Sequence, residues 1–315
     1  MTFTRNLGRR ARQALLCAGA LAALASCGGG TSQFVPFAPT RLFAFGDETS
    51  VLTPDGRKYS VNALKLDGTI DCFANPIWVQ EVANIYNFAF AECNPNGQAA
   101  TQARMSAVVG AHADDLKSQI DEQVSLGGFS STDLVTVMIG TNDVLDLYQQ
   151  FPALTQTALG DELRARGTRL ADQVNRLVQL GAKVIVSTVP DMGLTPYALA
   201  QRAANTDTDR AALLTQLTAE FNRGMRVNIL QDGRYIGLVL ADEWGQAAVA
   251  SPGSYGLNNV TAPVCAVELP GCSSDTLVPD GNVTTWLWAN DTLLSAGGQA
   301  RLGNLAVARA RNNPF

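Results

Sequence analysis

Carboxylates and glycines gather in two turns, each directly after an apolar run of the chain. Gly46-Asp47-Glu48 follows one run, and Gly140-Thr141-Asn142-Asp143 follows another. Two converging carboxylates can hydrolyse a glycosidic bond, and several can hold a hard cation. Asp47, Glu48 and Asp143 are candidates for either chemistry if the fold brings them together. The alternative is that they only brace the turns in which they stand.

A nucleophilic mechanism has few candidates in this chain. It needs a nucleophile, a base within hydrogen-bond reach and a group that orients the base. Ser50 stands near the first turn, and the single histidine is His112. We expect His112 to take a solvent-facing position at the start of a helix. A catalytic role for it is the alternative, and that role depends on geometry before pKa.

Strands and helices that alternate along the chain must position these turns. Continuous apolar runs predict strands buried on both faces of a parallel sheet, at residues 42–45, 134–139, 184–189 and 235–240. Apolar residues at helical spacing predict one helix around 170–178, with Gly181 at its C-terminal cap, and another around 213–225. This alternation predicts an α/β fold, a three-layer α/β/α sandwich with a mostly parallel central sheet.

The two turns, and a third at Pro190-Asp191, come at the carboxyl ends of predicted strands. Ligands of open parallel sheets bind beyond these ends, so we expect the site there. Residues 245–284 are rich in Gly, Pro, Asn and Thr and predict a long excursion. We expect this excursion to wall the site.

At these turns the sequence resembles the SGNH/GDSL hydrolases, a family of esterases and lipases with a flavodoxin-like fold. Phe45-Gly46-Asp47-Glu48-Thr49-Ser50 is similar to the family's opening Phe-Gly-Asp-Ser-Leu-Ser, and Gly140-Thr141-Asn142-Asp143 to its Gly-x-Asn-Asp block. Other similar stretches are 106–111, 189–196, 255–261 and 286–295. They follow the family's order, and the resemblance therefore implies the family's fold.

The resemblance also assigns roles to single residues. In the family a Ser attacks an ester carbonyl, a His takes the Ser proton and an Asp orients the His, while a glycine N–H and an Asn side chain donate to the oxyanion. Gly110 and Asn142 match the two donors. Glu48 stands at the Ser position, Asn290 at the Asp position and Leu293 at the His position. Leucine cannot move a proton, so the resemblance implies the fold without the catalytic triad.

Neighbouring residues do not restore the triad. A hydroxyl at Ser50 is displaced from the Ser position, and a shift of register to Asp291 leaves residues 292–294 where a His is needed. Asp47 and Asp143 are ordinary residues of the family, so Glu48 is the single new carboxylate. Its side chain can instead place a carboxylate where the oxyanion would form, between Gly110 and Asn142, and so plug the site.

The N-terminal residues predict export. Arginines without an acidic residue precede an apolar run, 14–25, of about 12 residues, too short to span a bilayer. Leu24-Ala25-Ser26-Cys27 resembles a lipobox, which would lipidate Cys27. We expect a signal peptide at 1–26, a lipidated tether at 27–39 and one SGNH/GDSL-hydrolase-like domain at 40–315. An ordinary secretory signal with an incidental Cys is the alternative.

The cysteines suit an oxidising compartment. Of six, Cys17 leaves with the signal peptide and Cys27 takes the lipid. The remaining four allow three connectivities, of which we favour the local pairs Cys72–Cys93 and Cys265–Cys272. A zinc site is the alternative, although neither a Cys-x-x-Cys pair nor a nearby His supports it.

The net charge of the chain limits the classes of partner that it can bind. A net charge of −5, with no basic cluster after the N-terminal segment, argues against nucleic acid. No cofactor and no metal are implied. We expect an outer-membrane lipoprotein of the cell envelope that binds an acyl or ester-like small molecule, a glycan or a protein of the envelope without hydrolysing it. An ester hydrolase with an unrecognised base is the alternative, and a purely structural envelope component is a third possibility.

Overall fold

Five strands form a central sheet in which every neighbouring pair is parallel. In sheet order they are β4 (Ala103–Met105), β1 (Arg41–Gly46), β5 (Asp133–Met138), β6 (Lys183–Ser187) and β7 (Ile236–Val239). This is the flavodoxin-like order. The chain first adds β4 on one side of β1 and then adds β5, β6 and β7 on the other side, so the topological reversal point lies between β1 and β5. The four predicted strands are confirmed, each within two residues of its expected bounds.

The computed structural model describes residues 36–315. The predicted signal peptide, Cys27 and the tether up to residue 35 lie outside the described residues. Within 36–315, no helix combines the length and the hydropathy needed to cross a membrane.

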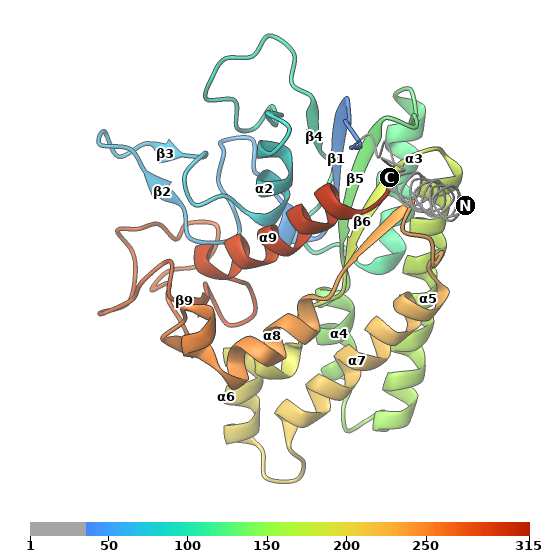
Figure 1. Cartoon of the computed structure of the whole chain (residues 1–315). Coiled ribbons are helices and arrows are strands. Elements are labelled where there is room, and N and C mark those ends of the chain that lie inside the picture. The colour runs from blue at the N-terminus through green and yellow to red at the C-terminus, as the bar shows by residue number, and fades with distance from the viewer. Residues whose placement is uncertain (1–35) are drawn as a thin grey trace, which may run out of the picture. The chain divides into compact units, whose positions relative to one another are not determined.

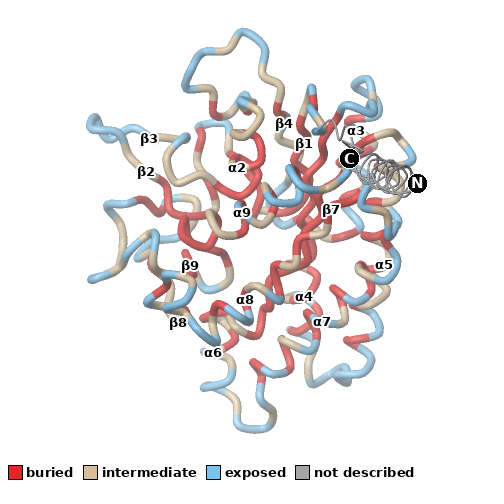
Figure 2. The backbone as a smooth tube through the Cα atoms, in the orientation of Figure 1, coloured by how far each residue is buried: buried red, intermediate tan, exposed pale blue. Residues whose placement is uncertain are grey.

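Helices cover both faces of the sheet (Figure 1). Along β1, Phe43 and Phe45 join one hydrophobic cluster, while Leu42 and Ala44 join the other, because successive side chains of a strand point to opposite faces. The first cluster contains side chains of α3 (Leu116–Ser125), α4 (Thr141–Tyr148), α5 (Gln156–Gln179), α6 (Pro196–Ala204) and α7 (Arg210–Asn228). The second contains side chains of α2 (Trp78–Asn84), α8 (Ala241–Ala250) and α9 (Ala296–Asn312). Buried segments therefore run along the sheet and the inner faces of the helices, as Figure 2 shows, and the predicted three-layer fold is confirmed.

The two predicted helices are confirmed and are longer than their apolar stripes. α5 extends the stripe at 170–178 back to Gln156, and α7 extends the stripe at 213–225 at both ends. The C-cap of α5 is Leu180 and not the predicted Gly181. Gly181 is the next residue and has φ +105°. That is the position past the cap where glycine is most favoured.

Residues 245–284 differ in part from the predicted excursion. The first of them continue α8, because the segment from Ala241 to Ala250 is rich in alanine and forms helix. The remainder contains a short 3-10 helix, η4 (Pro252–Tyr255), and β8 (Asn259–Pro263), which pairs with β9 (Trp286–Trp288). Other small elements are the hairpin of β2 (Ala63–Leu64) with β3 (Ile70–Asp71) and the 3-10 helices η1 (Glu48–Ser50), η2 (Ala113–Asp115) and η3 (Met192–Leu194).

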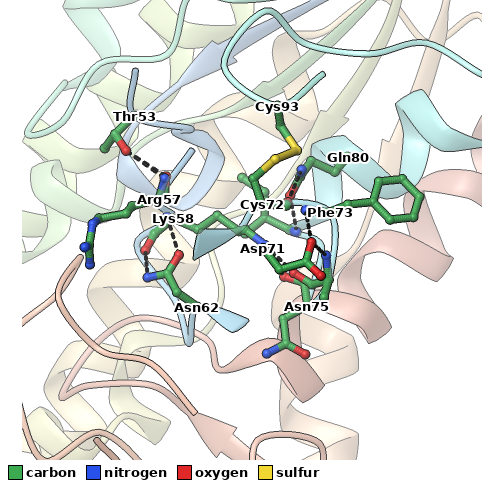
Figure 3. Close-up of a disulfide and its surroundings, with 12 residues drawn as sticks. Thr53, Arg57, Lys58, Asn62, Asp71, Cys72, Phe73, Asn75, Gln80 and Cys93 are labelled. Atoms are coloured by element: carbon green, nitrogen blue, oxygen red, sulfur yellow. Dashed lines mark hydrogen bonds between the residues drawn. A yellow bond between two sulfur atoms is a disulfide. The ribbon is translucent and has the colours of Figure 1, made fainter. Parts of the chain in front are cut away.

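Both predicted disulfides are confirmed. The Cα atoms lie 5.6 Å apart in Cys72–Cys93 and 5.8 Å apart in Cys265–Cys272. Cys72–Cys93 ties the segment after β3 to the loop before β4 (Figure 3). The four cysteines therefore serve as cross-links, and the zinc alternative is wrong.

Candidate functional site

The turn after β1 is held by contacts that only glycine permits. Gly46 has φ +138°, and a Cβ there would lie 2.0 Å from the carbonyl oxygen of Met138. The side chain of Gln119, on α3, accepts from the Gly46 N–H at 2.9 Å and donates to the Gly46 carbonyl at 2.9 Å. Asp47 then caps η1 by accepting from the Thr49 N–H at 3.0 Å. These contacts fix Glu48 at the carboxyl edge of the sheet.

Gly110 and Asn142 reach the same edge from neighbouring strands. After β4, the Val108 N–H donates to the Gly46 carbonyl at 3.0 Å, so the chain continues alongside the end of β1. Gly110 then turns with φ +75°. After β5, Gly140 takes φ +129° where a Cβ would lie 2.3 Å from the ring of Phe221, and it starts α4, whose first turn carries Asn142.

One carboxylate oxygen accepts from both predicted donors. Glu48 Oε2 lies 2.9 Å from the Gly110 N and 3.1 Å from Asn142 Nδ2. Asn142 Nδ2 also donates to the Ala111 carbonyl at 3.1 Å, which orients the amide. The site lies at the β1/β5 reversal of the sheet, where ligands of this fold class bind. The arrangement binds a negatively charged oxygen, and in this structure that oxygen belongs to the protein.

Asp47, beside Glu48, is a buried carboxyl without full hydrogen bonding. The residue is 0% exposed, and its Oδ2 has no hydrogen-bond partner among the described residues. Burial, together with the charge of Glu48, raises the pKa of Asp47 to about 7. Asp47 therefore holds its proton to a higher pH than a free aspartate does.

Asp143 braces a turn and does not join the other two carboxylates. Its Oδ2 accepts from the Ala113 N–H at 2.8 Å, and its Oδ1 accepts from Arg166 Nη1 at 3.0 Å. Burial raises the pKa of Asp143, and these hydrogen bonds oppose the rise. Asp143 therefore does not join Asp47 and Glu48 in a carboxylate cluster, and residues 36–315 contain no group of three or more His, Cys, Asp or Glu side chains placed to hold a metal ion.

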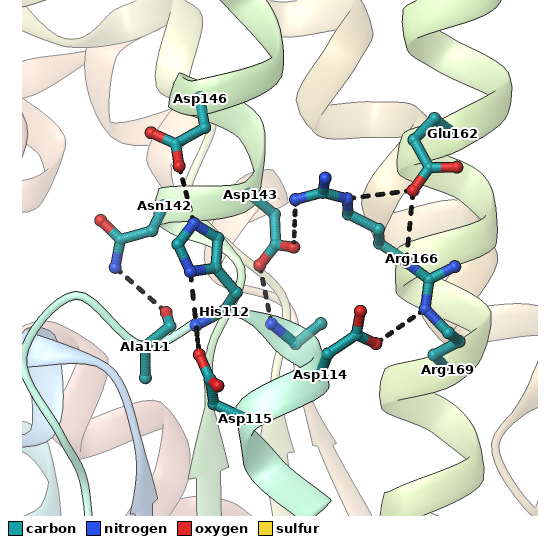
Figure 4. A network of polar contacts seen from close by, with 11 residues as sticks. Ala111, His112, Asp114, Asp115, Asn142, Asp143, Asp146, Glu162, Arg166 and Arg169 are labelled. Atoms are coloured by element: carbon teal, nitrogen blue, oxygen red, sulfur yellow. Dashed lines mark hydrogen bonds and ion pairs between the residues drawn. The ribbon is translucent and has the colours of Figure 1, made fainter.

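A chain of ion pairs continues from Asp143 along α5 (Figure 4). Arg166 Nε donates to Glu162 at 3.1 Å, and Arg169 donates to Glu162 at 3.2 Å and to Asp114 at 2.7 Å. Through Asp114 and Asp143 the network joins the loop after Gly110 to α4. It thereby fixes the separation between the two groups that donate to Glu48.

His112 lies between two carboxylates rather than facing solvent freely. Its Nε2 is 2.8 Å from Asp146 Oδ2, and its Nδ1 is 3.7 Å from Asp115 Oδ2 (Figure 4). It caps η2, so its predicted place at a helix start is confirmed, while its side chain is only 33% exposed. The solvent-facing position is confirmed in part, since the half-buried ring pairs with carboxylates of η2 and α4 that are themselves more than half exposed.

Ser50 is not available as a nucleophile. The residue is fully buried in η1, and its Oγ accepts from the indole N–H of Trp78 at 3.1 Å. A hydroxyl in that position anchors α2 to the turn after β1, and it has no contact with solvent or with His112.

Asn290 and Leu293 form a turn before α9. Asn290 Oδ1 accepts from the backbone N–H groups of Thr292 at 3.0 Å and Leu293 at 2.7 Å, and Leu293 is 6% exposed. The Tyr197 N–H donates to the Asp291 carbonyl at 3.0 Å, so α6 supports this turn. Asn290 therefore braces its own turn, and Leu293 contributes a buried apolar side chain.

Gln119 and Arg166 are the two positioning residues that the sequence did not reveal. Gln119 precedes Ile120 on the buried side of α3, and a polar residue among those apolar positions was its one signal. Nothing in the sequence distinguishes Arg166 from the other arginines of α5.

The flavodoxin-like sheet with two donors converging at its reversal point defines the class of three-layer α/β/α domains with a site at the carboxyl edge of the sheet. A family model described as GDSL-like Lipase/Acylhydrolase matches residues 68–282. The match covers more than half of the chain, and the chain belongs to this family. The matched segment includes Gly110 and Asn142, while Glu48, Asn290 and Leu293 lie outside it.

Solved structures with this fold are distant in sequence. A lipolytic protein of the G-D-S-L family from Veillonella parvula is 13% identical, with 86% of this chain and 95% of that chain covered and a TM-score of 0.40. The lipase Lip_vut3 from a goat rumen metagenome is 11% identical, with 87% and 99% covered and a TM-score of 0.50. The acetylxylan esterase Axe2 from Geobacillus stearothermophilus is 16% identical, with 87% and 96% covered and a TM-score of 0.42. No curated protein matches the chain in sequence. At these identities the likeness concerns the fold alone.

Proposed function

We propose that this chain is a GDSL-family protein that binds a ligand at its oxyanion site without hydrolysing it. The observation that carries the proposal is the position of Glu48 Oε2, 2.9 Å from the Gly110 N and 3.1 Å from Asn142 Nδ2. Donors at 2.7–3.1 Å are what a developing oxyanion needs, and a carboxylate oxygen occupies that place. A substrate carbonyl would have to displace Glu48 before it could enter.

The residues at the three triad positions support a loss of hydrolysis. Attack on an ester needs a hydroxyl whose proton passes to an imidazole. Glu48 has no hydroxyl group, and Leu293 has no basic group. The side-chain oxygen of Asn290 already accepts hydrogen bonds from the backbone N–H groups of Thr292 and Leu293. Attack by the Glu48 carboxylate itself would form an anhydride with no base to resolve it.

The ligand is proposed to present an acidic or carbonyl oxygen, as an acyl or ester-like small molecule or an acylated glycan or protein of the envelope does. Such an oxygen competes with Glu48 for the same two donors. Val108 and Val109, next to Gly110, are 54% and 48% exposed and offer an apolar surface for the rest of an acyl group.

An ester hydrolase remains the second candidate, on one observation. His112 Nε2 lies 2.8 Å from Asp146 Oδ2, which is the pairing of an imidazole with an orienting carboxylate. This candidate requires a nucleophile beside His112, and Ser50 is buried against Trp78. It also requires Glu48 to leave the two donors.

A fluorophosphonate probe and a short-chain nitrophenyl ester test catalysis directly on the purified domain. We expect neither labelling nor turnover above that of His112→Ala. Labelling of wild type that is lost in His112→Ala would establish the hydrolase instead.

Ligand binding is tested by thermal shift with butyrate. Glu48→Ala frees the two donors, so butyrate should raise its melting temperature more than that of wild type. Asn258→Ala, which removes an exposed amide elsewhere, is the matched control. Equal shifts in all three proteins would contradict the proposed binding site.

We further propose that residues 1–26 are removed on export and that Cys27 carries a lipid anchor at the outer membrane, with 40–315 as the domain it tethers. The support is the short apolar run that ends in Leu24-Ala25-Ser26-Cys27. Mass spectrometry of the protein from membranes should find Cys27 as a lipidated N-terminus. An unprocessed or unmodified N-terminus would refute this part of the proposal and leave the binding site untouched.

A further inference from the structure

A second concave site lies away from Glu48, at the other end of the sheet. A cavity of about 140 Å³ is lined by Phe73, by residues of α2 and by residues of the loop that joins α2 to β4. That loop enters β4 at its amino end, where Phe90 and Ala103 form a β-bridge, whereas Glu48 follows the carboxyl end of β1. The cavity opens into a shallow groove that shares Asn87, Phe88 and Gln98 with it.

The lining carries amides and aromatic rings and no charge. None of the residues that line the cavity or the groove is acidic or basic. Asn84, Asn87 and Asn96 line this space, and their side-chain amides form no hydrogen bond with another residue of 36–315. Asn84 is half-buried, while Asn87 and Asn96 are exposed. Each free amide offers both donors and an acceptor. The site therefore suits a neutral ligand that both donates and accepts hydrogen bonds.

Aromatic side chains supply the apolar part of the lining. Phe90 is buried at 2% exposure, Phe88 is half-buried, and Phe73 is 53% exposed. Phe73 follows Cys72 of the disulfide (Figure 3). The ring of Tyr86, in the groove, packs 5.8 Å from the ring of Phe88. An engineered cavity of roughly 150 Å³ takes up one benzene ring, so this space admits a single six-membered ring.

The walls are held in place before any ligand arrives. The Cys72–Cys93 disulfide joins the segment of Phe73 to the loop, and Gln80 Nε2 donates to the Cys72 carbonyl at 3.0 Å (Figure 3). Asn94 closes the loop by donating to the Gln98 carbonyl at 2.8 Å and accepting from the Gln98 N–H at 2.9 Å. A preformed site loses little entropy when it binds.

We propose that this cavity binds one ring of a neutral carbohydrate, with the rest of the glycan lying along the groove. A pyranose has an apolar C–H face for the phenylalanine rings and hydroxyl groups that match amides as donors and acceptors. A benzene-like ring, or the side chain of a Phe in a partner protein, fits the volume but forms no hydrogen bond with the amides of Asn84, Asn87 and Asn96, so it uses less of the lining than a sugar does. The inference does not depend on the state of the Glu48 site.

Saturation-transfer NMR on the purified domain tests the proposal with six probes: xylose, glucose, N-acetylglucosamine and their β-1,4-linked disaccharides. At least one sugar should bind, with the disaccharide tighter than its monosaccharide because the groove adds contacts. Asn84→Ala and Asn87→Gly should each weaken that binding by about tenfold, the loss of one good hydrogen bond. Asn87 has φ +57°, so glycine keeps its backbone conformation.

Controls separate a lost amide from a lost fold. Asn258→Ala removes an exposed amide outside the cavity and should leave sugar binding unchanged. Melting temperatures should show that all variants are folded. The proposal is overturned if none of the six sugars binds, if Asn84→Ala and Asn87→Gly bind them as wild type does, or if phenol binds in the cavity and the sugars do not.

Discussion

At the scale of single residues, Glu48 determines which acceptor the two donors of the site hold. Gly110 and Asn142 would otherwise face solvent or a ligand oxygen, and both donate to Glu48 Oε2 instead. Hydrogen bonds to a charged acceptor are stronger than those between neutral groups. Under the proposed function, a glutamate at this position supplies no hydroxyl nucleophile and satisfies both donors.

The strength of this contact is measured by comparing Glu48→Gln with Glu48→Ala. Both variants remove the charge next to Asp47, so the difference between them isolates the acceptor oxygen. Glutamine keeps that oxygen, and we expect Glu48→Ala to be less stable than Glu48→Gln by about 1 kcal/mol. Urea unfolding of both gives the difference, and equal stabilities would mean that Glu48 does not hold the two donors in solution.

Asp47 should make stability depend on pH. Its pKa is raised to about 7 in the folded protein, above the value near 4 of an unfolded aspartate. The folded state therefore binds more protons than the unfolded state between these values, and this contribution to stability falls as pH rises from about 4 to about 7.

The variant Asp47→Asn tests this because it stays neutral at every pH and keeps the acceptor for the Thr49 N–H. As the pH rises from 5 to 8, wild type should lose stability and Asp47→Asn should not. The free energy of unfolding of Asp47→Asn minus that of wild type should therefore increase over this range, by an amount on the order of a few kcal/mol. Glu48→Gln should reduce the pH dependence of wild type in part, because the charge of Glu48 contributes to the raised pKa. A constant difference between wild type and Asp47→Asn across this range would contradict the expectation.

At the scale of elements, the end of β1 sets the geometry of the site. Gly46 has a positive φ and packs closely against β5. The side chain of Gln119, on α3, forms hydrogen bonds with the Gly46 N–H and carbonyl. The position tolerates no side chain, because a Cβ would meet the Met138 carbonyl at 2.0 Å.

Gly46→Ala should therefore destabilise the protein by about 3 kcal/mol or more, through both strain and overpacking. Gly245→Ala is the matched control: its Cβ meets nothing within 4 Å inside α8, and alanine should stabilise that helix by about 0.5–1 kcal/mol. Thermal unfolding of the pair should show opposite signs. A tolerated Gly46→Ala would show that the end of β1 is free to move.

The elements also show what the sequence could and could not predict. Strands with long apolar runs, such as β5, were predictable because burial on both faces leaves a strong pattern. β4 was not, since its three residues include Arg104 and carry no such run. The convergence of Glu48, Gly110 and Asn142 followed from the family resemblance, whereas the roles of Gln119 and Arg166 depend on tertiary contacts that no local pattern encodes.

At the scale of the whole molecule, the site is assembled from both ends of the domain. Glu48, Asn290 and Leu293, which the resemblance assigns to the triad positions, all lie outside the segment 68–282 that matches the family model. The two ends meet in space: Gln299 Nε2 donates to the Thr49 carbonyl at 3.4 Å, and Ser60 Oγ donates to the Leu294 carbonyl at 2.9 Å. The middle of the chain thus supplies the two donors, while under the proposed function Glu48, Asn290 and Leu293 at the two ends supply no path for a proton.

A triad acts as a unit, so restoring one member alone should do little. Glu48→Ser provides a hydroxyl without a base. Leu293→His provides a base without a nucleophile, beside a neutral Asn290. Asn290→Asp keeps an acceptor for the Thr292 and Leu293 N–H groups, so it should not disturb its turn. Only the three changes together rebuild the proton path, next to donors that Glu48→Ser would also set free.

Hydrolysis of a short-chain nitrophenyl ester by wild type, the three single variants and the triple variant measures this cooperation. Wild type should show at most the roughly 10³–10⁴-fold enhancement over water that binding and an oxyanion site give without a triad, and less if Glu48 keeps the donors occupied. The triple variant should exceed every single variant by at least about tenfold, because no single change completes the path. Two results would contradict the loss of catalysis: efficient turnover by wild type that disappears in Glu48→Ala, or turnover that disappears in His112→Ala. The first would make the carboxylate a nucleophile, and the second would make the His112–Asp146 pair the base that the family's own position lacks.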